Sequence, residues 1–224
     1  MIACTVCAFH PLCHSRASQA GAPSPVESRK RLARGQALFR AGSPRVSIFA
    51  VRAGFLKERV ELPGGHTHIV RFLLPGDAAG LDACDGVHRS DLIALGDCEV
   101  CEVPTYRAEI LCDFNPRIGA HLRGHIAEEL VRSQGHAASL ACLGVHRRLA
   151  GFLIDLGKRW MDRGYSACSF LLPMSRREIA EHLGLTPETV SRVLGEFQQH
   201  GWIKPQRRSV EILDARALAE VLAR

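Results

Sequence analysis

The sequence predicts an α+β protein with an N-terminal antiparallel β domain of the β-roll (jelly-roll) type, one long helix, and a C-terminal unit of short helices with a hairpin. Three observations predict this order. Short apolar runs separated by turn residues occupy residues 29–115, a four-residue apolar repeat follows Pro116, and helix-capping signals follow residue 174. We divide the chain into 1–28 (a Cys-rich segment and linker), 29–115 (the β domain), 116–144 (the long helix) and 145–224 (the C-terminal unit).

Composition excludes several classes of protein. Of the 224 residues, 46% are hydrophobic and 23% are charged, which is ordinary for a globular protein. No apolar run approaches the ~20 residues that span a bilayer, and the N-terminus lacks the features of a secretory signal, so we expect a cytoplasmic location without membrane contact. Nine Cys in that compartment indicate thiol, metal or redox chemistry rather than disulfides. The net charge of +6 permits a polyanionic partner without identifying one.

The first thirteen residues, MIACTVCAFHPLC, contain three Cys in the spacing Cys-x2-Cys-x5-Cys. Cys-x2-Cys occurs in zinc sites and in redox motifs alike, so the spacing is compatible with a metal site without identifying the metal, and zinc and iron–sulfur sites both usually take four protein ligands. The N-terminal thiols are Cys4, Cys7 and Cys13, with His10 or His14 as alternative zinc ligands. The fourth thiol is expected from Cys84, Cys98, Cys101 or Cys112, and strand alternation places Cys98 and Cys101 on opposite faces. We expect Cys142 and Cys168 to be packed as small hydrophobic residues.

The β domain is predicted from apolar runs at 46–51 (VSIFAV), 55–62 and 69–74, separated by Pro63-Gly64-Gly65 and closed by Pro75-Gly76-Asp77. Runs of this length with such turns are typical of antiparallel strands. Residues 14–28 before them are small, polar and Pro-rich, which is typical of a connector. We expect His66 and His68 to be exposed in a hairpin.

The long helix is predicted from apolar residues that recur every four positions: Ile118, Leu122, Ile126 and Leu130. A narrow apolar stripe on a long helix is typical of a dimer seam, and it predicts a homodimer. The alternative is that the stripe packs on its own domain.

The C-terminal unit begins with a predicted helix at 146–161 and continues with two short helices. Ser175 and Glu178 form a capping box, Gly184 is a C-cap, and Thr186-Pro187 starts the next helix. Two short helices joined through a glycine turn indicate a helix-turn-helix.

The second of these helices separates into an apolar face and a polar face. Arg, Glu and Ser side chains in the first turns of a recognition helix read base edges in DNA. The predicted DNA contacts are Thr186, Glu188, Thr189, Ser191 and Arg192, and the apolar face contains Val190, Val193, Leu194 and Phe197. The basic residues Lys204, Arg207 and Arg208 lie in a predicted hairpin, or wing, suited to phosphates. The alternative is an ordinary solvated helix face.

Taken together, the chain resembles the CRP/FNR superfamily of bacterial transcription regulators. The most specific stretch is LTPETVSRVLGEFQQHGWI (185–203), in which E-x-x-S-R is similar to the base-reading triplet of the FNR branch. The resemblance implies a β-roll like that of cyclic nucleotide-binding proteins, a winged helix-turn-helix, and a dimer on a TTGAT-type palindrome in double-stranded DNA. It also implies contact with RNA polymerase through loops around Gly76-Asp77.

The resemblance also implies an oxygen-sensing [4Fe-4S] cluster, because the N-terminal Cys spacing is that of FNR-type sensors. The stretch VCEVP (100–104) then makes Cys101 the fourth ligand. The implied mechanism is that the cluster favours the dimer and that its loss frees the N-terminal loop. Cyclic AMP is disfavoured because Gly80-Leu81 replaces the expected Gly-Glu pair, although Arg89-Ser90 is present. Heme or nitric oxide sensing, zinc and thiol oxidation are the alternatives within this fold.

An enzyme is the alternative from a different class. A thiol oxidoreductase requires a thiolate at a helix N-terminus beside a βαβ unit, whereas Cys4 and Cys7 precede Pro11 and a connector. No Gly-rich phosphate loop, G-x-S-x-G or H-E-x-x-H motif occurs. We therefore expect a protein that is not an enzyme.

Overall fold

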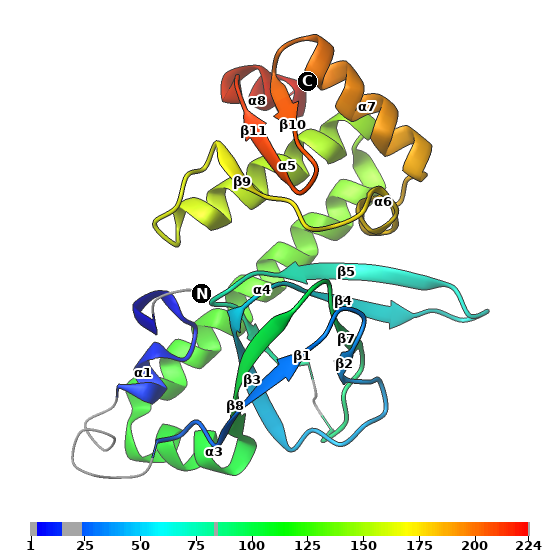
Figure 1. Ribbon diagram of the computed structural model, residues 1–224. Helices are drawn as coiled ribbons and strands as arrows, with labels where there is room; N and C mark the ends of the chain where they lie inside the picture. Colours follow the sequence, from blue (N-terminus) through cyan, green and yellow to red (C-terminus); the bar gives the residue numbers. More distant parts are fainter. Residues whose placement is uncertain (1–3, 15–23, 83–84, 224) are drawn as a thin grey trace. The chain divides into compact units, whose positions relative to one another are not determined.

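The computed structural model describes residues 4–14, 24–82 and 85–223, which form two compact units (Figure 1). The N-terminal unit comprises Met1–Arg132 and the C-terminal unit comprises Ser133–Arg224. The elements up to the long helix are η1 (Cys4–Val6), α1 (His10–Cys13), β1 (Ser28–Leu32), β2 (Ala37–Phe39), β3 (Ser47–Ala53), β4 (Leu56–Glu61), β5 (Thr67–Leu73), β6 (Ala78–Ala79), β7 (Asp91–Ala94), β8 (Cys98–Pro104), α3 (Thr105–Phe114) and α4 (Pro116–Cys142).

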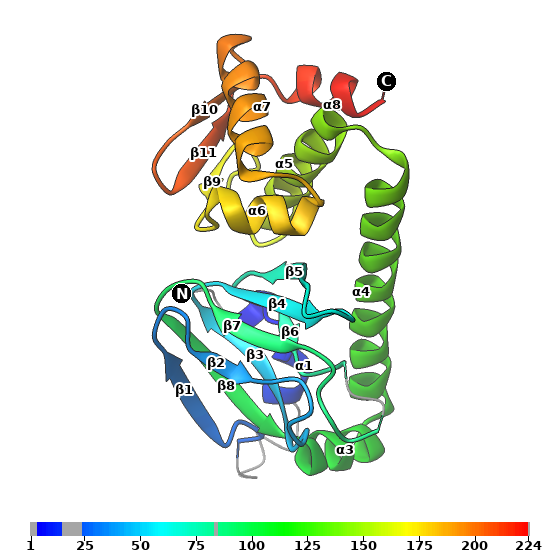
Figure 2. The ribbon, with the colours of Figure 1, turned by 90° about the vertical axis from the view of Figure 1, so that its right-hand side faces the viewer.

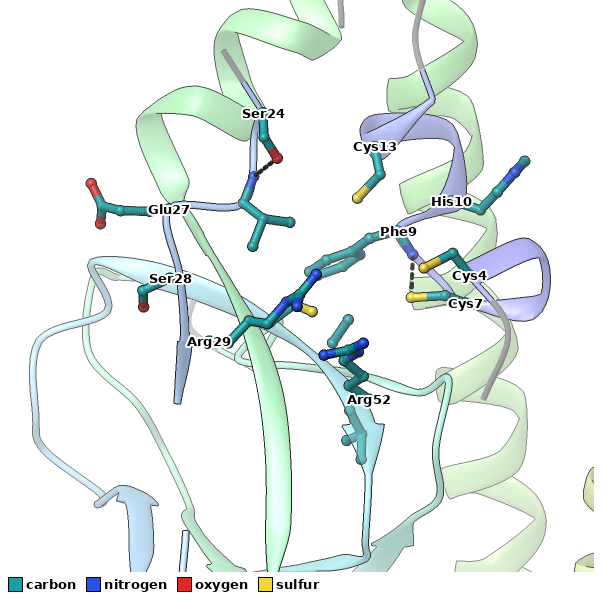
Figure 3. A pocket seen from close by; sticks show the side chains of 14 residues that line it. Cys4, Cys7, Phe9, His10, Cys13, Ser24, Glu27, Ser28, Arg29 and Arg52 are labelled. Atoms are coloured by element: carbon teal, nitrogen blue, oxygen red, sulfur yellow. Dashed lines mark hydrogen bonds between the residues drawn. The ribbon is translucent and has the colours of Figure 1, made fainter. Parts of the chain in front are cut away.

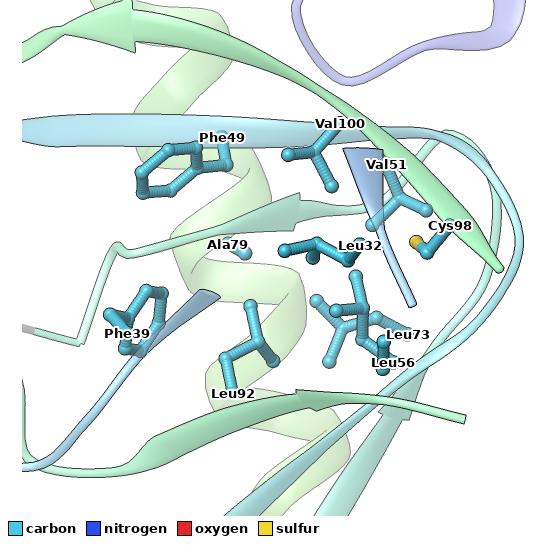
Figure 4. Packing of buried hydrophobic residues seen from close by; sticks show 11 residues of the cluster. Leu32, Phe39, Phe49, Val51, Leu56, Leu73, Ala79, Leu92, Cys98 and Val100 are labelled. Atoms are coloured by element: carbon cyan, nitrogen blue, oxygen red, sulfur yellow. The ribbon is translucent and has the colours of Figure 1, made fainter. Parts of the chain in front are cut away.

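The β-roll consists of two antiparallel sheets with a shared apolar core (Figure 4). The strand orders are β1-β8-β3-β6 and β2-β7-β4-β5. Alternating residues of each strand point inward, so that β8 contributes Cys98 and Val100 to the core. The predicted strands at 46–51, 55–62 and 69–74 correspond to β3, β4 and β5.

The predicted β domain ends in a helix that its apolar runs did not predict, because residues 105–114 form α3. Pro104 ends β8, since it has no N–H to continue the ladder. The following stretch TYRAEILCDF contains several good helix formers and packs Ala108 against the roll.

A second apolar cluster lies on the outer face of the β1-β8-β3-β6 sheet, where the N-terminal segment packs with α3 and the start of α4. Its buried members are Ala8, Phe9, Leu12, Ile48, Ala50, Ala78, Val103, Ala108 and Ile118. Phe9 and Leu12 are almost completely buried. Burial of one such side chain stabilises by about 1.5–3 kcal/mol. The segment that contains Cys4, Cys7 and Cys13 therefore has an apolar anchor that does not depend on its thiols.

The apolar stripe of α4 divides into two halves. Ile118 is 1% exposed and Leu122 packs on the second cluster, whereas Ile126 is 46% exposed and Leu130 is 58% exposed. The first half of the stripe therefore packs on its own domain, which was the alternative prediction, because the N-terminal segment covers those turns. The seam prediction applies to the second half.

An ion-pair network connects the roll to α4 within the N-terminal unit. Arg71 on β5 pairs with the buried Glu58 of β4 and with Glu129 of α4. Ser90 donates its hydroxyl to Glu58 at 2.6 Å. Although burial disfavours a charged guanidinium, the two carboxylates raise the pKa of Arg71, so it remains a cation.

The C-terminal unit is a winged helix-turn-helix (Figure 2). Its elements are α5 (Val145–Met161), β9 (Ser169–Leu171), α6 (Arg176–Leu183), α7 (Pro187–Gln199), β10 (Ile203–Pro205), β11 (Ser209–Ile212) and α8 (Ala215–Ala223). The three strands form one sheet of order β10-β11-β9, and the β10–β11 hairpin lies beside α7. The expectation for Cys142 and Cys168 is wrong, because both are exposed, one at the end of α4 and the other in the loop before β9.

Candidate functional site

The predicted metal ligands line one cavity of about 480 Å³ (Figure 3). The thiols of Cys4, Cys7 and Cys13 come from the N-terminal segment, and Cys101 comes from β8. The Cys7 sulfur accepts a hydrogen bond from the Phe9 N–H at 3.4 Å. The fold thus brings three thiols of the N-terminal segment and one distant thiol of β8 to one cavity.

Strand alternation places Cys101 at this cavity and removes its nearest rival. Cys101 lies opposite Arg29 of β1 and Ala50 of β3, on the outer face of the sheet. Cys98 points into the core between the sheets, and its thiol donates to the Ala53 carbonyl at 3.0 Å. Cys112 packs against the second apolar cluster from α3. Cys84 lies outside the described residues.

The backbone of Ala8 joins the N-terminal segment to two other elements. Its N–H donates to the Gly76 carbonyl at 2.9 Å, and its own carbonyl accepts from Nε2 of His121 on α4 at 3.0 Å. Pro75 and Gly76 are buried in this arrangement, and Asp77 is only partly exposed. The N-terminal segment therefore covers the Gly76 side of this turn, and the expected contact of loops around Gly76-Asp77 with RNA polymerase stays a prediction.

Burial controls the protonation of these thiols. It raises the pKa of Cys7 and, together with repulsion from Cys7, raises that of Cys13 to about 12. Burial also raises the pKa of Cys101, although Arg29 and Arg52 oppose the shift. These three thiols are therefore protonated at neutral pH unless a bound cation displaces their protons.

The donor set fits a thiolate-bound metal group, since four thiols, and two guanidiniums that offset their charge, line one cavity. Within residues 4–14, 24–82 and 85–223, no three His, Cys, Asp or Glu side chains are already placed as a metal-binding group. The thiols share the cavity without being in ligating positions.

The helix-turn-helix forms by the local signals that predicted it. Ser175 accepts from the Glu178 N–H at 3.2 Å while Glu178 accepts from the Ser175 N–H at 2.8 Å, which completes the capping box. Gly184 adopts the left-handed conformation with φ of 63°. Thr186 accepts from the Thr189 N–H at 3.2 Å and starts α7.

The predicted base-contacting side chains occupy the outer face of α7. Glu188, Ser191 and Arg192 are exposed, whereas the predicted apolar face is buried. The Ser191 hydroxyl donates to the Pro187 carbonyl at 2.9 Å. Arg192 pairs with Glu196, and Glu196 also pairs with His146 of α5 at 2.6 Å. This network was not predicted from the sequence, although the i,i+4 spacing of Arg192 and Glu196 on a helix indicates an ion pair.

Comparison with known proteins connects both regions to one family. Residues 147–221 match the Crp-like helix-turn-helix domain, and residues 29–113 match the cyclic nucleotide-binding domain. The chain is 36% identical over 197 residues to the anaerobic regulatory protein of Haemophilus influenzae (88% of this chain, 77% of the relative). It is 38% identical over 191 residues to the transcriptional activator protein FnrA of Stutzerimonas stutzeri (85% and 78%). The chain belongs to the CRP/FNR family of transcription regulators.

The solved structure of FixK2 from Bradyrhizobium japonicum has the same CRP/FNR architecture, with a TM-score of 0.80, 27% identity, and coverage of 87% of this chain and 96% of that chain. The predicted fold is therefore confirmed. Because its CRP/FNR relatives are transcription regulators, the chain is a DNA-binding regulator and not an enzyme, as predicted. None of the helices in the described ranges combines the length and apolar character that a membrane span requires.

The Arg-Ser pair of this CRP/FNR chain is engaged by its own carboxylates. The Ser90 hydroxyl contacts Glu58 at 2.6 Å and Asp82 at 3.2 Å, and the Arg89 guanidinium pairs with Asp85. Carboxylates at this position repel a phosphate. The arrangement supports the prediction that a cyclic nucleotide is not the ligand.

Proposed function

We propose that this chain is an oxygen-responsive regulator that holds a [4Fe-4S] cluster with Cys4, Cys7, Cys13 and Cys101. The observation that carries the proposal is the convergence of these thiols, and of no other described Cys, on one cavity. Two of its relatives are named as an anaerobic regulatory protein and as FnrA, which supports an oxygen-linked role. Bound at this cavity, the cluster would supply an oxygen-labile cross-link between the N-terminal segment and β8.

The protein's own residues determine where that cross-link acts. Phe9 and Leu12 hold the segment against Ile118 and Leu122 in the first turns of α4. Ile126 and Leu130 in the next turns are exposed and form the proposed homodimer seam. Loss of the cross-link changes how the segment is held but leaves the apolar anchor intact, so the segment is loosened rather than freed.

In the proposed dimer, two copies of α7 bind the half-sites of a TTGAT-type palindrome in cytoplasmic DNA, ~34 Å apart, as helix-turn-helix dimers require. Arg192, Glu188 and Ser191 contact base edges, and Thr186 and Thr189 lie at the helix start near phosphates. Lys204 and Arg207 of the wing add phosphate contacts. RNA polymerase is a further proposed partner, through loops around Gly76-Asp77, where Asp77 is partly exposed.

The test is the content of iron and acid-labile sulfide per monomer after anaerobic purification and again after exposure to air. We expect about four of each per monomer, the number in one [4Fe-4S] cluster, with loss in air accompanied by loss of operator binding. Cys101→Ser should abolish the iron, whereas Cys142→Ser, at an exposed thiol away from the cavity, should retain it.

Two outcomes would contradict the proposal. Zinc in place of iron, or no metal with operator binding unchanged by air, would remove the oxygen sensor and leave the DNA-binding role. Full iron retention in Cys101→Ser would remove the ligand assignment.

A further inference from the structure

We propose that Arg29 and Arg52 are the charge partners of the thiolate-bound metal group, and that they raise its reduction potential and slow its loss in air. This inference rests on the proposed cluster and assigns a function to two side chains that are not ligands. It follows from what lines the cavity besides the thiols.

Both guanidiniums belong to the wall of the cavity (Figure 3). Arg29 on β1 is the register partner of Cys101 on β8, and Arg52 reaches the cavity from β3 on the other side of β8. The figure shows the two side chains directed toward the same space as Cys4 and Cys7. Two cations therefore flank the strand that provides Cys101.

The position of Arg52 is fixed by Glu99, which lies two residues before Cys101 on β8. Glu99 pairs with Arg52 and also with Arg31 at 3.5 Å. The Arg52 side chain is 24% exposed, so its charge is partly shielded from water. Glu99 itself is not part of the cavity wall.

Negative charge on the wall does not cancel the two cations. Among the described lining residues the carboxylate is that of Glu27, which pairs with Arg107 at 3.5 Å and points away from the thiols in Figure 3. Arginine stays protonated at all accessible pH values. The side chains of the wall therefore carry a net positive charge, which Glu99, paired with Arg52, and Asp77, near Cys7, offset in part.

This charge matters because a metal group with four thiolates is negative overall, and reduction makes it more negative. A nearby cation stabilises the reduced form more than the oxidised form, which raises the reduction potential, and net charge is a recognised determinant of iron–sulfur potentials. The same cation opposes the removal of an electron by oxygen. Partial burial strengthens both effects, since charges interact more strongly away from bulk water.

The experiment compares Arg29→Gln and Arg52→Gln with Arg31→Gln in the full-length protein with its cluster bound. Arg31 is a matched control, because it lies on the same face of β1 and pairs with Glu99 but does not line the cavity. The measurements are the midpoint potential, in an anaerobic titration with dithionite, and the rate of iron release in air. Arg29→Lys keeps the charge.

We expect Arg29→Gln and Arg52→Gln to shift the midpoint potential to more negative values and to release iron severalfold faster. Arg31→Gln and Arg29→Lys should behave like the unmodified protein. Arg29→Gln could also fail to retain a cluster at all. If its melting temperature is then unchanged and Arg29→Lys keeps the cluster, the positive charge at position 29 is again shown to support the cluster.

The failures of the two proposals are distinguishable. Absence of iron from the unmodified protein would overturn both. A normal cluster in the unmodified protein, with potentials and release rates in Arg29→Gln and Arg52→Gln equal to those of Arg31→Gln, would overturn only the inference.

Discussion

At the scale of single residues, Arg192, a proposed base contact, pairs with a neighbouring carboxylate. Glu196 lies one turn along α7 and pairs with Arg192 and with His146. The hydrogen bond from His146, followed by that from Arg192, lowers the pKa of Glu196 and keeps it ionised. In the free protein the pair with Glu196 orients the Arg192 side chain. Binding to a guanine edge would require Arg192 to share or leave Glu196, and because an i,i+4 ion pair is weak, this exchange costs little.

Arg192→Ala should weaken operator binding by ~1–3 kcal/mol and relax the choice of base at one position of each half-site. Titration of operator variants at fixed salt measures both effects. Arg216→Ala is the matched control, because Arg216 on α8 pairs with Glu220 at the same i,i+4 spacing. Unchanged affinity in Arg192→Ala would contradict the assignment of α7 as the reading helix.

The same scale shows what could be predicted of the site. The two-residue period of a strand, which is a local property, separated Cys98 from Cys101, and the family resemblance then favoured Cys101. Arg29 and Arg52 could not be assigned, because their positions depend on which strands pair with β8 and in what register. Register is set by long-range packing, and a single sequence does not specify it.

At the scale of elements, successive turns of α4 differ in what covers them. Its first turns are buried by the N-terminal segment, and the turns around Ile126 and Leu130 remain exposed. The Glu58–Arg71–Glu129 network holds the helix at Glu129, which lies between these two exposed residues. The stripe looked uniform in sequence because periodicity identifies an apolar face but not what covers it.

The double variant Ile126→Ala/Leu130→Ala should weaken dimerisation while leaving the melting temperature of the monomer almost unchanged, because both side chains are exposed. Ile118→Ala should do the reverse and destabilise the N-terminal unit by about 2–5 kcal/mol, since it empties a buried position. Sedimentation and thermal unfolding separate the two effects. A normal dimer in the double variant would place the seam elsewhere.

Local signals explain which elements were predictable. The capping box, the glycine C-cap and the Thr-Pro start involve contacts within four residues, and all formed where expected. Helix α3 was missed because its apolar pattern is weak and its position depends on where the preceding strand ends.

At the scale of the whole molecule, the order of β-roll, long helix and winged helix-turn-helix was predictable, because each part has its own periodicity. The folding of the N-terminal segment onto the roll was not, since Phe9 and Leu12 stand in a stretch that has no regular pattern. The stability of the whole N-terminal unit depends on such contacts between distant segments. One of them includes a titratable pair on α4.

His125 should make the N-terminal unit less stable in mild acid. Burial, with a smaller contribution from His121, lowers the pKa of His125, although Glu128 and Asp77 oppose the shift and Arg132 adds to it. The unfolded chain therefore takes up a proton first as the pH falls below about 6.5. The stability that the neutral ring provides is complete above that pH and is lost as the pH falls through the lowered folded-state pKa.

Melting temperatures of the unmodified protein and of His125→Asn between pH 7.5 and 5 measure this dependence. We expect the difference between the two proteins to shrink as the pH falls, because Asn has no proton to gain. As the pH falls, the decrease in melting temperature that depends on His125 should begin before the carboxylates take up protons. An identical pH slope in both proteins would show that other groups are responsible.

The backbone joint at Ala8, meaning its hydrogen bonds with Gly76 and His121, has a consequence for which substitutions the N-terminal tip tolerates. Its two bonds, from the Ala8 N–H to the Gly76 carbonyl and from the His121 imidazole to the Ala8 carbonyl, use only the peptide groups of Ala8 and Gly76 together with one imidazole. Any small residue at position 8 preserves them, so drift in the side chains of the N-terminal tip leaves the joint intact. Substitutions elsewhere in the thiol-bearing tip can therefore change its chemistry while these two bonds to the roll and to α4 stay in place.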